Sequence, residues 1–209
     1  HIRATDQENS GRCWMFAGLN VFRYLLIKAL DLENFEFSET YLFFYDKLER
    51  ANYVLQYFID HPDANPEDRR IAMLMTDYFG DGGYWNYFSN LVEKYGLVSK
   101  TAMLETFQSG WTTDMNNILR ERIVSCCNQI LLVHARKDQR ASQEALQNLK
   151  EETLKQLYSC LVKFLGQPPK TFTWSFITSN KTPQSISNLD PKAFKDLVLG
   201  PIKVDDFVT

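Results

Sequence analysis

The sequence predicts a mainly α-helical protein, and three observations lead to that fold class. Glycine and proline are scarce, with 9 and 7 among 209 residues, which argues against an all-β chain rich in turns. Apolar residues recur at steps of three and four through most of the chain, as they do on the buried face of a helix. A single short segment, residues 171–176, alternates between polar and apolar residues as a strand does.

The first half of the chain predicts four helices. They are expected over residues 13–30, 38–60, 67–78 and 85–95. Ser38 is a natural N-cap for the second, and Glu39 suits the positive start of a helix. The sequence Gly80–Gly83 predicts a tight turn, and Gly96 is expected to end the fourth helix.

The second half predicts a long helical hairpin. Its first helix is indicated by apolar residues at helical spacing from Met115 to Val133, and Ser142 is expected to cap the second. Gly166, followed by two prolines, predicts the end of that helix. After the strand, Asp190 and the proline that follows it predict one more helix over residues 191–199.

Charge and cysteine content exclude several classes of protein. The formal net charge of −3 does not fit a chain that coats nucleic acid, and no apolar run is long enough to span a membrane. Four cysteines are too few for a disulfide scaffold. Cys126, Cys127 and Cys160 fall within apolar helical stripes and are expected to be buried thiols. Cys126, Cys127 and His134 lack zinc-ligand spacing, so neither a metal nor a cofactor is predicted.

Cys13 differs from the other cysteines because it opens an apolar helix after a polar segment. A helix N-terminus stabilises a thiolate, and Arg12 would add positive charge nearby. The side-chain amide of Gln7 could join the Cys13 N–H in binding an oxyanion. Gly11 would let a substrate backbone approach, and Trp14 could shield the site from water. From these residues alone, Cys13 is either a nucleophile or an ordinary buried thiol.

The segment from Gln7 to Ala17 resembles the nucleophile segment of papain-like cysteine proteases. Its Ser-Gly-Arg-Cys-Trp sequence is similar to that of bleomycin hydrolases and related bacterial aminopeptidases. The resemblance extends to residues 35–47, to Asp81-Gly82-Gly83 with Trp85, and to residues 168–174. One departure is Asp6, where the family usually has asparagine. Ser10 replaces a cysteine of the common form, which fits a cytoplasmic branch of the family.

The resemblance implies the fold and its parts. It implies the helical left half of a papain-like α+β cysteine peptidase fold plus a long inserted helical hairpin, with the right, β-barrel-like half absent from this chain. Residues 1–111 would form the left half with the nucleophile helix. Residues 112–170 would be the helical insertion, and residues 171–209 would be the strand and the segment leading to the missing half.

The resemblance also implies an activity, namely that of a cytoplasmic thiol aminopeptidase acting on small or unfolded peptides. Cys13 would be the nucleophile, Gln7 would complete the oxyanion hole, and the substrate would contact Gly11, Trp14, Gly82 and Gly83. The last two could be only a turn, or their backbone could bind an extended peptide.

The catalytic base is not expected among the three histidines of this chain. His1 is a chain end, His61 lies in a predicted loop, and His134 lies in a predicted helix, whereas the family's histidine sits at a strand. The histidine and asparagine of the site would therefore come from beyond Thr209 or from a second chain. This chain alone is expected to be inactive.

The expected partners are peptides and further copies of the protein. The resemblance implies a homohexamer built through residues 112–165, with no membrane association. The alternative is a catalytically dead helical scaffold or assembly module that could bind nucleic acid. Support for nucleic acid is weak, because residues 112–165 carry a net charge of only +2 and a single basic cluster, Arg136-Lys137 with Arg140.

Overall fold

The computed structural model describes residues 4–65, 67–135, 139–200 and 204, which fall into two compact units. The first unit draws on residues 1–46, 81–111 and 165–209, and the second on residues 47–80 and 112–164. The boundary runs through helix α2 (Glu39–Asp60). These units group the chain differently from the predicted parts 1–111, 112–170 and 171–209. That division by role stays a prediction.

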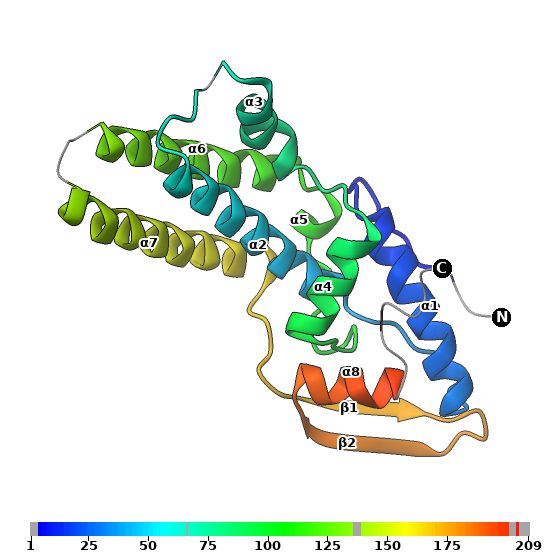
Figure 1. Cartoon of the computed structure of the whole chain (residues 1–209). Coiled ribbons are helices and arrows are strands. Elements are labelled where there is room, and N and C mark those ends of the chain that lie inside the picture. The colour runs from blue at the N-terminus through cyan, green and yellow to red at the C-terminus, as the bar shows by residue number, and fades with distance from the viewer. Residues whose placement is uncertain (1–3, 66, 136–138, 201–203, 205–209) are drawn as a thin grey trace. The chain divides into compact units, whose positions relative to one another are not determined.

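Three helices form the body of the first unit: α1 (Cys13–Ala29), α4 (Trp85–Tyr95) and α8 (Pro191–Leu199) (Figure 1). Each contacts the other two. Helix α1 approaches α4 closely at Gly18, where an added Cβ would lie 2.5 Å from the Phe88 ring. The predicted positions of all three helices are confirmed.

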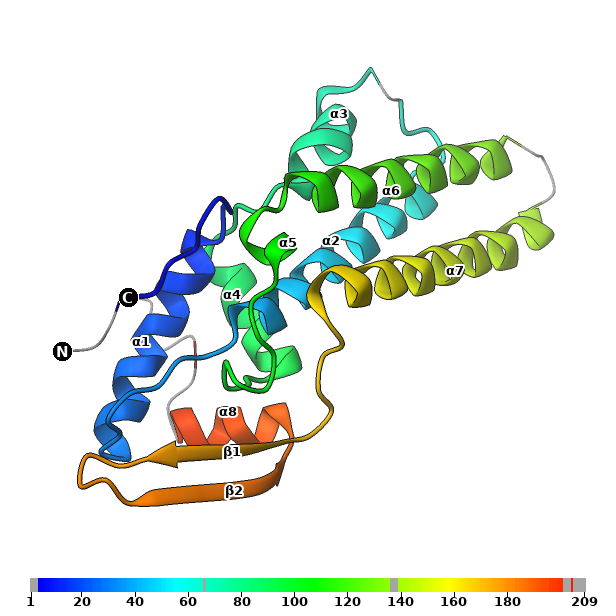
Figure 2. The same ribbon diagram turned by 180° about the vertical axis from the view of Figure 1, so that it is seen from behind.

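A two-stranded antiparallel hairpin covers α8 in the first unit (Figure 2). Strand β1 (Phe172–Ile177) was predicted, whereas β2 (Pro183–Leu189) was not. Trp174 of β1 is buried and packs edge-on against Phe194 of α8, with ring centroids 5.0 Å apart, and against Phe35. This aromatic cluster forms part of the core of the first unit.

The predicted helix ends of the first unit agree with the structure at two caps. The Ser38 hydroxyl accepts a hydrogen bond of 3.1 Å from the Tyr41 N–H at the start of α2. The Asp190 carboxylate accepts hydrogen bonds from the backbone N–H groups of Lys192 and Ala193 at the start of α8. One short helix, α5 (Phe107–Gly110), was not predicted; Thr106 and Ser109 form its capping box.

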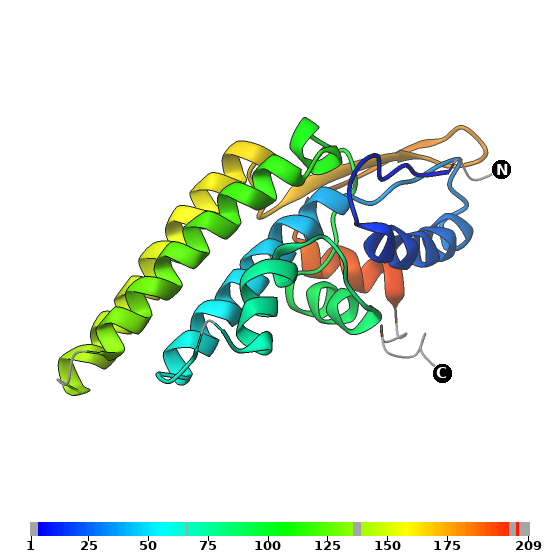
Figure 3. The same cartoon turned by 90° about the horizontal axis from the view of Figure 1, so that it is seen from above.

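The second unit contains the long hairpin of α6 (Thr113–His134) and α7 (Gln139–Leu165), which run side by side (Figures 1 and 3). The hairpin is confirmed, but Ser142 is not its cap, because α7 begins three residues earlier at Gln139. The two helices meet through the Thr153 hydroxyl, which donates to Cys126 Sγ over 3.2 Å. None of the described helices is long and apolar enough to cross a membrane.

The chain leading to the glycine turn is held by two buried cations of α2. It follows α3 (Arg69–Thr76) and a 3-10 turn (Asp77–Phe79). Lys47 Nζ donates to the carbonyl oxygens of Phe79 and Gly80 over 3.2 and 3.1 Å, and Arg50 donates to the Tyr78 carbonyl over 2.9 Å. These bonds give the backbone carbonyls of this segment hydrogen-bond partners.

Candidate active site

Cys13 is the first residue of α1, and its side chain is exposed. The carbonyl of Arg12 accepts hydrogen bonds from the N–H groups of Met15 and Phe16, over 2.9 and 3.1 Å, which closes the first turn. The thiol therefore lies where backbone N–H groups point outward and the helix dipole favours negative charge. An exposed cysteine in this position suits a nucleophile better than a packing residue.

The other three cysteines are chemically unlike Cys13. Burial raises the pKa of each of them, and raises that of Cys127 to about 12. Cys126 and Cys127 are buried, as predicted, whereas Cys160 is only half-buried. Because the thiolate is the reactive form, these cysteines are poor nucleophiles at neutral pH. Cys13 is thus the best candidate nucleophile of the four.

The glycine turn is fastened to the nucleophile segment through Asp81. The Asp81 carboxylate accepts a hydrogen bond of 3.2 Å from the Gly11 N–H. The Asp81 carbonyl accepts one of 2.7 Å from the indole N–H of Trp14. The structure therefore brings Gly11 and Trp14 together with the turn that contains Gly82 and Gly83.

The two glycines of this turn have different roles in packing. An added Cβ on Gly83 would lie 2.5 Å from the Trp14 ring, so this position must lack a side chain for the indole to pack there. An added Cβ on Gly82 would meet no described atom within 4 Å, and Gly82 is exposed. Gly82 therefore has no side chain that would block the approach of an extended ligand.

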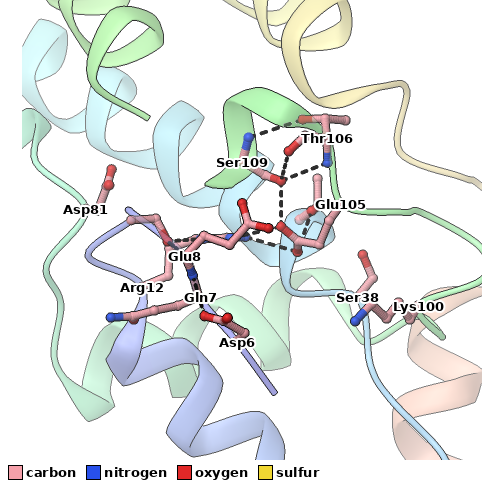
Figure 4. Close-up of polar contacts among 12 residues, drawn as sticks. Asp6, Gln7, Glu8, Arg12, Ser38, Asp81, Lys100, Glu105, Thr106 and Ser109 are labelled. Atoms are coloured by element: carbon pink, nitrogen blue, oxygen red, sulfur yellow. Dashed lines mark hydrogen bonds and ion pairs between the residues drawn. The ribbon is translucent and has the colours of Figure 1, made fainter. Parts of the chain in front are cut away.

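Arg12 does not supply free positive charge to the thiol, contrary to the sequence-based expectation. Its guanidinium is 1% exposed and forms a two-pronged ion pair with Glu105, with N–O distances of 3.1 and 2.8 Å (Figure 4). The charge is therefore neutralised inside the first unit. Sequence reasoning missed Glu105 because it lies 93 residues away and belongs to no recognisable motif.

Gln7 belongs to the tight turn that precedes α1. Its carbonyl accepts hydrogen bonds from the Ser10 N–H and the Ser10 hydroxyl, over 3.3 and 2.7 Å. Its side chain extends away from the Arg12–Glu105 pair (Figure 4). The side-chain oxygen is buried and receives no hydrogen bond from the described residues. Its role in an oxyanion hole stays a prediction.

Glu39, expected to be a charged residue at the start of α2, is 2% exposed. Its Oε2 atom has no hydrogen-bond partner among the described residues. Burial raises the pKa of this carboxyl to about 7, opposed mainly by a hydrogen bond from the Glu39 backbone; the charge of Glu105 raises the pKa further, and those of Lys100 and Arg12 lower it. The side chain is therefore largely protonated below neutral pH, which the sequence did not indicate.

Neither described histidine has the surroundings of a catalytic base. His134 is the last residue of α6, and its Nε2 lies 3.1 Å from the Phe58 carbonyl oxygen. His61 is exposed and stacks on Tyr57. His1 lies outside the described residues, as do Arg136 and Lys137, so the basic cluster that they form with Arg140 stays a prediction. In the described part of the chain, no three His, Cys, Asp or Glu residues are grouped to hold a metal.

Comparison with solved structures shows the class of fold. The crystal structure of PepW from Lactobacillus rhamnosis matches with a TM-score of 0.90 at 31% identity, over 95% of this chain and 44% of that one. The predicted fold class is thus confirmed as a mostly helical, partial papain-like peptidase fold.

Sequence comparison then shows the family. The model of the Peptidase C1-like family matches residues 2–209. Aminopeptidase C of Listeria innocua is 40% identical over 92% of this chain, and bleomycin hydrolase of Homo sapiens is 36% identical over 91% of it. The chain belongs to the Peptidase C1-like family. It spans 42% of the length of each of these two relatives.

Proposed function

We propose that the protein to which this chain belongs is a cytoplasmic thiol aminopeptidase that cleaves amide bonds in small or unfolded peptides. The observation that carries the proposal is the exposed Cys13 at the start of α1, in the segment that Asp81 joins to the glycine turn. The names of the relatives, aminopeptidase C and bleomycin hydrolase, support the same chemistry. Cys13 and the glycine turn of this chain would form one side of the substrate cleft.

The reaction proceeds by acyl transfer. The Cys13 thiolate attacks the carbonyl carbon of the scissile amide, and the resulting oxyanion is held by the Cys13 N–H and the Gln7 amide. A histidine supplied from outside the described residues protonates the leaving amine as the C–N bond breaks. Water then hydrolyses the thioester, which releases the acid and regenerates the thiol.

Replacement of Cys13 by alanine in the full-length protein is expected to abolish turnover of aminoacyl amide substrates. No other described cysteine has both exposure and a helix N-terminus, so no residual thiol chemistry should remain. The measurement is initial rate with a fluorogenic amide. Cys160→Ala is the matched control and should retain activity, because this thiol is half-buried in the second unit. Full activity in Cys13→Ala would exclude the proposed nucleophile.

The rival proposal is a catalytically dead helical scaffold. It predicts that the unmodified full-length protein does not turn over any aminoacyl amide, before or after treatment with iodoacetamide. The exposed Cys13 at a helix start favours the peptidase, because it is set apart from the other three cysteines, whose pKa values are raised by burial.

We also propose that the protein assembles into a homohexamer through residues 112–165. Apolar side chains on α6 and α7 are exposed there, Leu132 by 64%, Ile118 by 46% and Tyr158 by 37%. If the active sites of such a hexamer face an internal cavity, that cavity would restrict substrates to small or unfolded chains. Such exposed apolar residues on paired helices favour burial against another subunit.

The variant Leu132→Glu is expected to shift the sedimentation coefficient of the full-length protein from a hexamer to smaller species. A charge buried at a subunit contact is strongly unfavourable, whereas in a monomer the exposed position tolerates it. Met73→Glu is the control, because Met73 is 49% exposed on α3, outside the hairpin. A wild-type protein that sediments as a monomer at micromolar concentration would contradict the assembly.

A further inference from the structure

The buried guanidinium of Arg12 is held by hydrogen bonds and by contacts with aromatic rings. Its Nε donates to the Ser10 hydroxyl over 2.9 Å, and its two terminal nitrogens donate to the two oxygens of Glu105. The rings of Phe16 and Phe43 lie 5.1 and 5.2 Å from its central carbon. A planar group held at its edges by hydrogen bonds and at its faces by aromatic rings has little freedom.

Glu105 is the point where three segments of the first unit meet (Figure 4). Besides Arg12, it accepts hydrogen bonds from the hydroxyls of Thr40, at 2.8 Å, and Ser109, at 2.5 Å. Burial would raise the pKa of Glu105, but the hydrogen bonds and the charge of Arg12 outweigh it and lower that pKa. The carboxylate therefore stays ionised at neutral pH, and it can accept all the hydrogen bonds that its partners donate.

Two partners of Glu105, Thr40 and Ser109, lie in the first turns of helices. Thr40 lies in the first turn of α2, whose cap is Ser38. Ser109 belongs to the capping box of α5 with Thr106, and its hydroxyl also accepts from the Thr106 N–H over 2.8 Å. The carboxylate is thus held by two helices that are distant in sequence from α1, and through Arg12 it reaches the residue next to Cys13.

We infer that the Arg12–Glu105 pair positions Cys13 for attack on the substrate carbonyl. The inference rests on the proposed function. Arg12 is the N-cap residue of α1, yet its side chain makes no capping hydrogen bond; it runs instead to Glu105. The pair thereby sets where the first turn of α1 begins and in which direction the next side chain leaves it. Arg12 and Glu105 are positioning residues, because neither is required to touch the substrate.

Arg12 could act on the thiol through its charge or by positioning it, and the two roles predict different pH–rate profiles. If Arg12 acted by its charge, removing that charge would move the acid limb of the pH–rate profile. Because Glu105 neutralises the guanidinium, positioning predicts that the profile keeps its midpoint while its height falls. A small misplacement of a nucleophile lowers the rate of the chemical step far more than it changes binding.

The test compares Arg12→Lys with Arg23→Lys in the full-length protein. Arg23 is also a buried arginine of α1, 2% exposed, and it donates to the Asn34 side chain and faces Glu36 at 3.7 Å. Lysine keeps the charge at either site, but at position 12 it loses the two-pronged contact with Glu105. We expect Arg12→Lys to lower kcat about tenfold or more, with KM within about twofold and an unchanged pH midpoint. Arg23→Lys should leave kcat within about twofold.

The double variant Arg12→Leu/Glu105→Leu keeps the inference testable if Arg12→Lys does not fold. It removes both buried charges together, so no unpaired charge remains to unfold the unit. We expect it to melt near the wild-type temperature while kcat stays low and iodoacetamide alkylates Cys13 with the wild-type pH dependence. Wild-type kcat in either variant, or a shifted pH midpoint, would overturn the inference. Turnover retained in Cys13→Ala would instead overturn the proposed function.

Discussion

Replacement of Gly96 by alanine is expected to lower the free energy of unfolding by about 3–5 kcal/mol, through two effects that act together. Gly96 ends α4 with φ of +77°, a conformation that side chains rarely adopt. An added Cβ would also lie 2.2 Å from the Pro191 carbonyl oxygen. That carbonyl accepts a hydrogen bond of 2.8 Å from the Leu97 N–H, so the backbones of α4 and α8 cannot separate without losing it.

The variant Gly166→Ala separates the two effects. Gly166 has a similar φ of +84°, but an added Cβ there would meet no described atom within 4 Å. Its substitution should therefore show the backbone strain alone, at about 1 kcal/mol. Urea unfolding of the full-length protein and both variants measures the difference. Equal losses for Gly96→Ala and Gly166→Ala would show that the contact between α4 and α8 is loose enough to accept a methyl group.

Most helices could be predicted because their signals are local. The end of α4 at Gly96, the cap at Ser38 and the cap at Asp190 each depend on a residue within one turn of the helix end. Strand β2 (Pro183–Leu189) was missed because its side chains are exposed or half-buried, which leaves no apolar alternation to read. Pairing with β1 makes it a strand, and pairing is not a local signal. Ser142 was misjudged as a cap because residues 139–141 also continue the helix.

In the candidate site, too, features with a local sequence signal could be predicted, whereas those that depend on distant contacts could not. Cys13, Gln7, Gly11, Trp14 and the glycine turn could be proposed from the sequence because they form short motifs. The contacts that hold them could not be found, because they join distant segments. Asp81 lies 70 residues from Gly11, and Glu105 lies 93 residues from Arg12. A charged residue beside a cysteine is easily taken for an electrostatic activator, and only its distant partner shows that the charge is neutralised.

Glu39 is expected to make the protein less stable as the pH rises toward neutral and above. The pKa of its buried carboxyl is about 7, compared with an ordinary value of 4.5. A carboxyl with a raised pKa holds its proton more tightly in the folded than in the unfolded state. Stability is therefore complete below about pH 4.5 and is lost as the pH rises through about 7. Between pH 5 and pH 8 this loss amounts to roughly 2–3 kcal/mol.

The variant Glu39→Gln should remove this part of the pH dependence, because the amide cannot ionise. Its free energy of unfolding should exceed that of the wild type at pH 8 by up to roughly 2–3 kcal/mol, and the gap should close toward pH 5. Urea unfolding at pH 5, 6, 7 and 8 measures it. Glu121→Gln, an exposed carboxyl on α6, controls for the general loss of one negative charge. The role of Glu39 would be refuted if Glu39→Gln and Glu121→Gln followed the same pH curve. Agreement with the expectation would mean that the charge state of Glu39, beside the Arg12–Glu105 pair, changes within the neutral range where a thiol peptidase works.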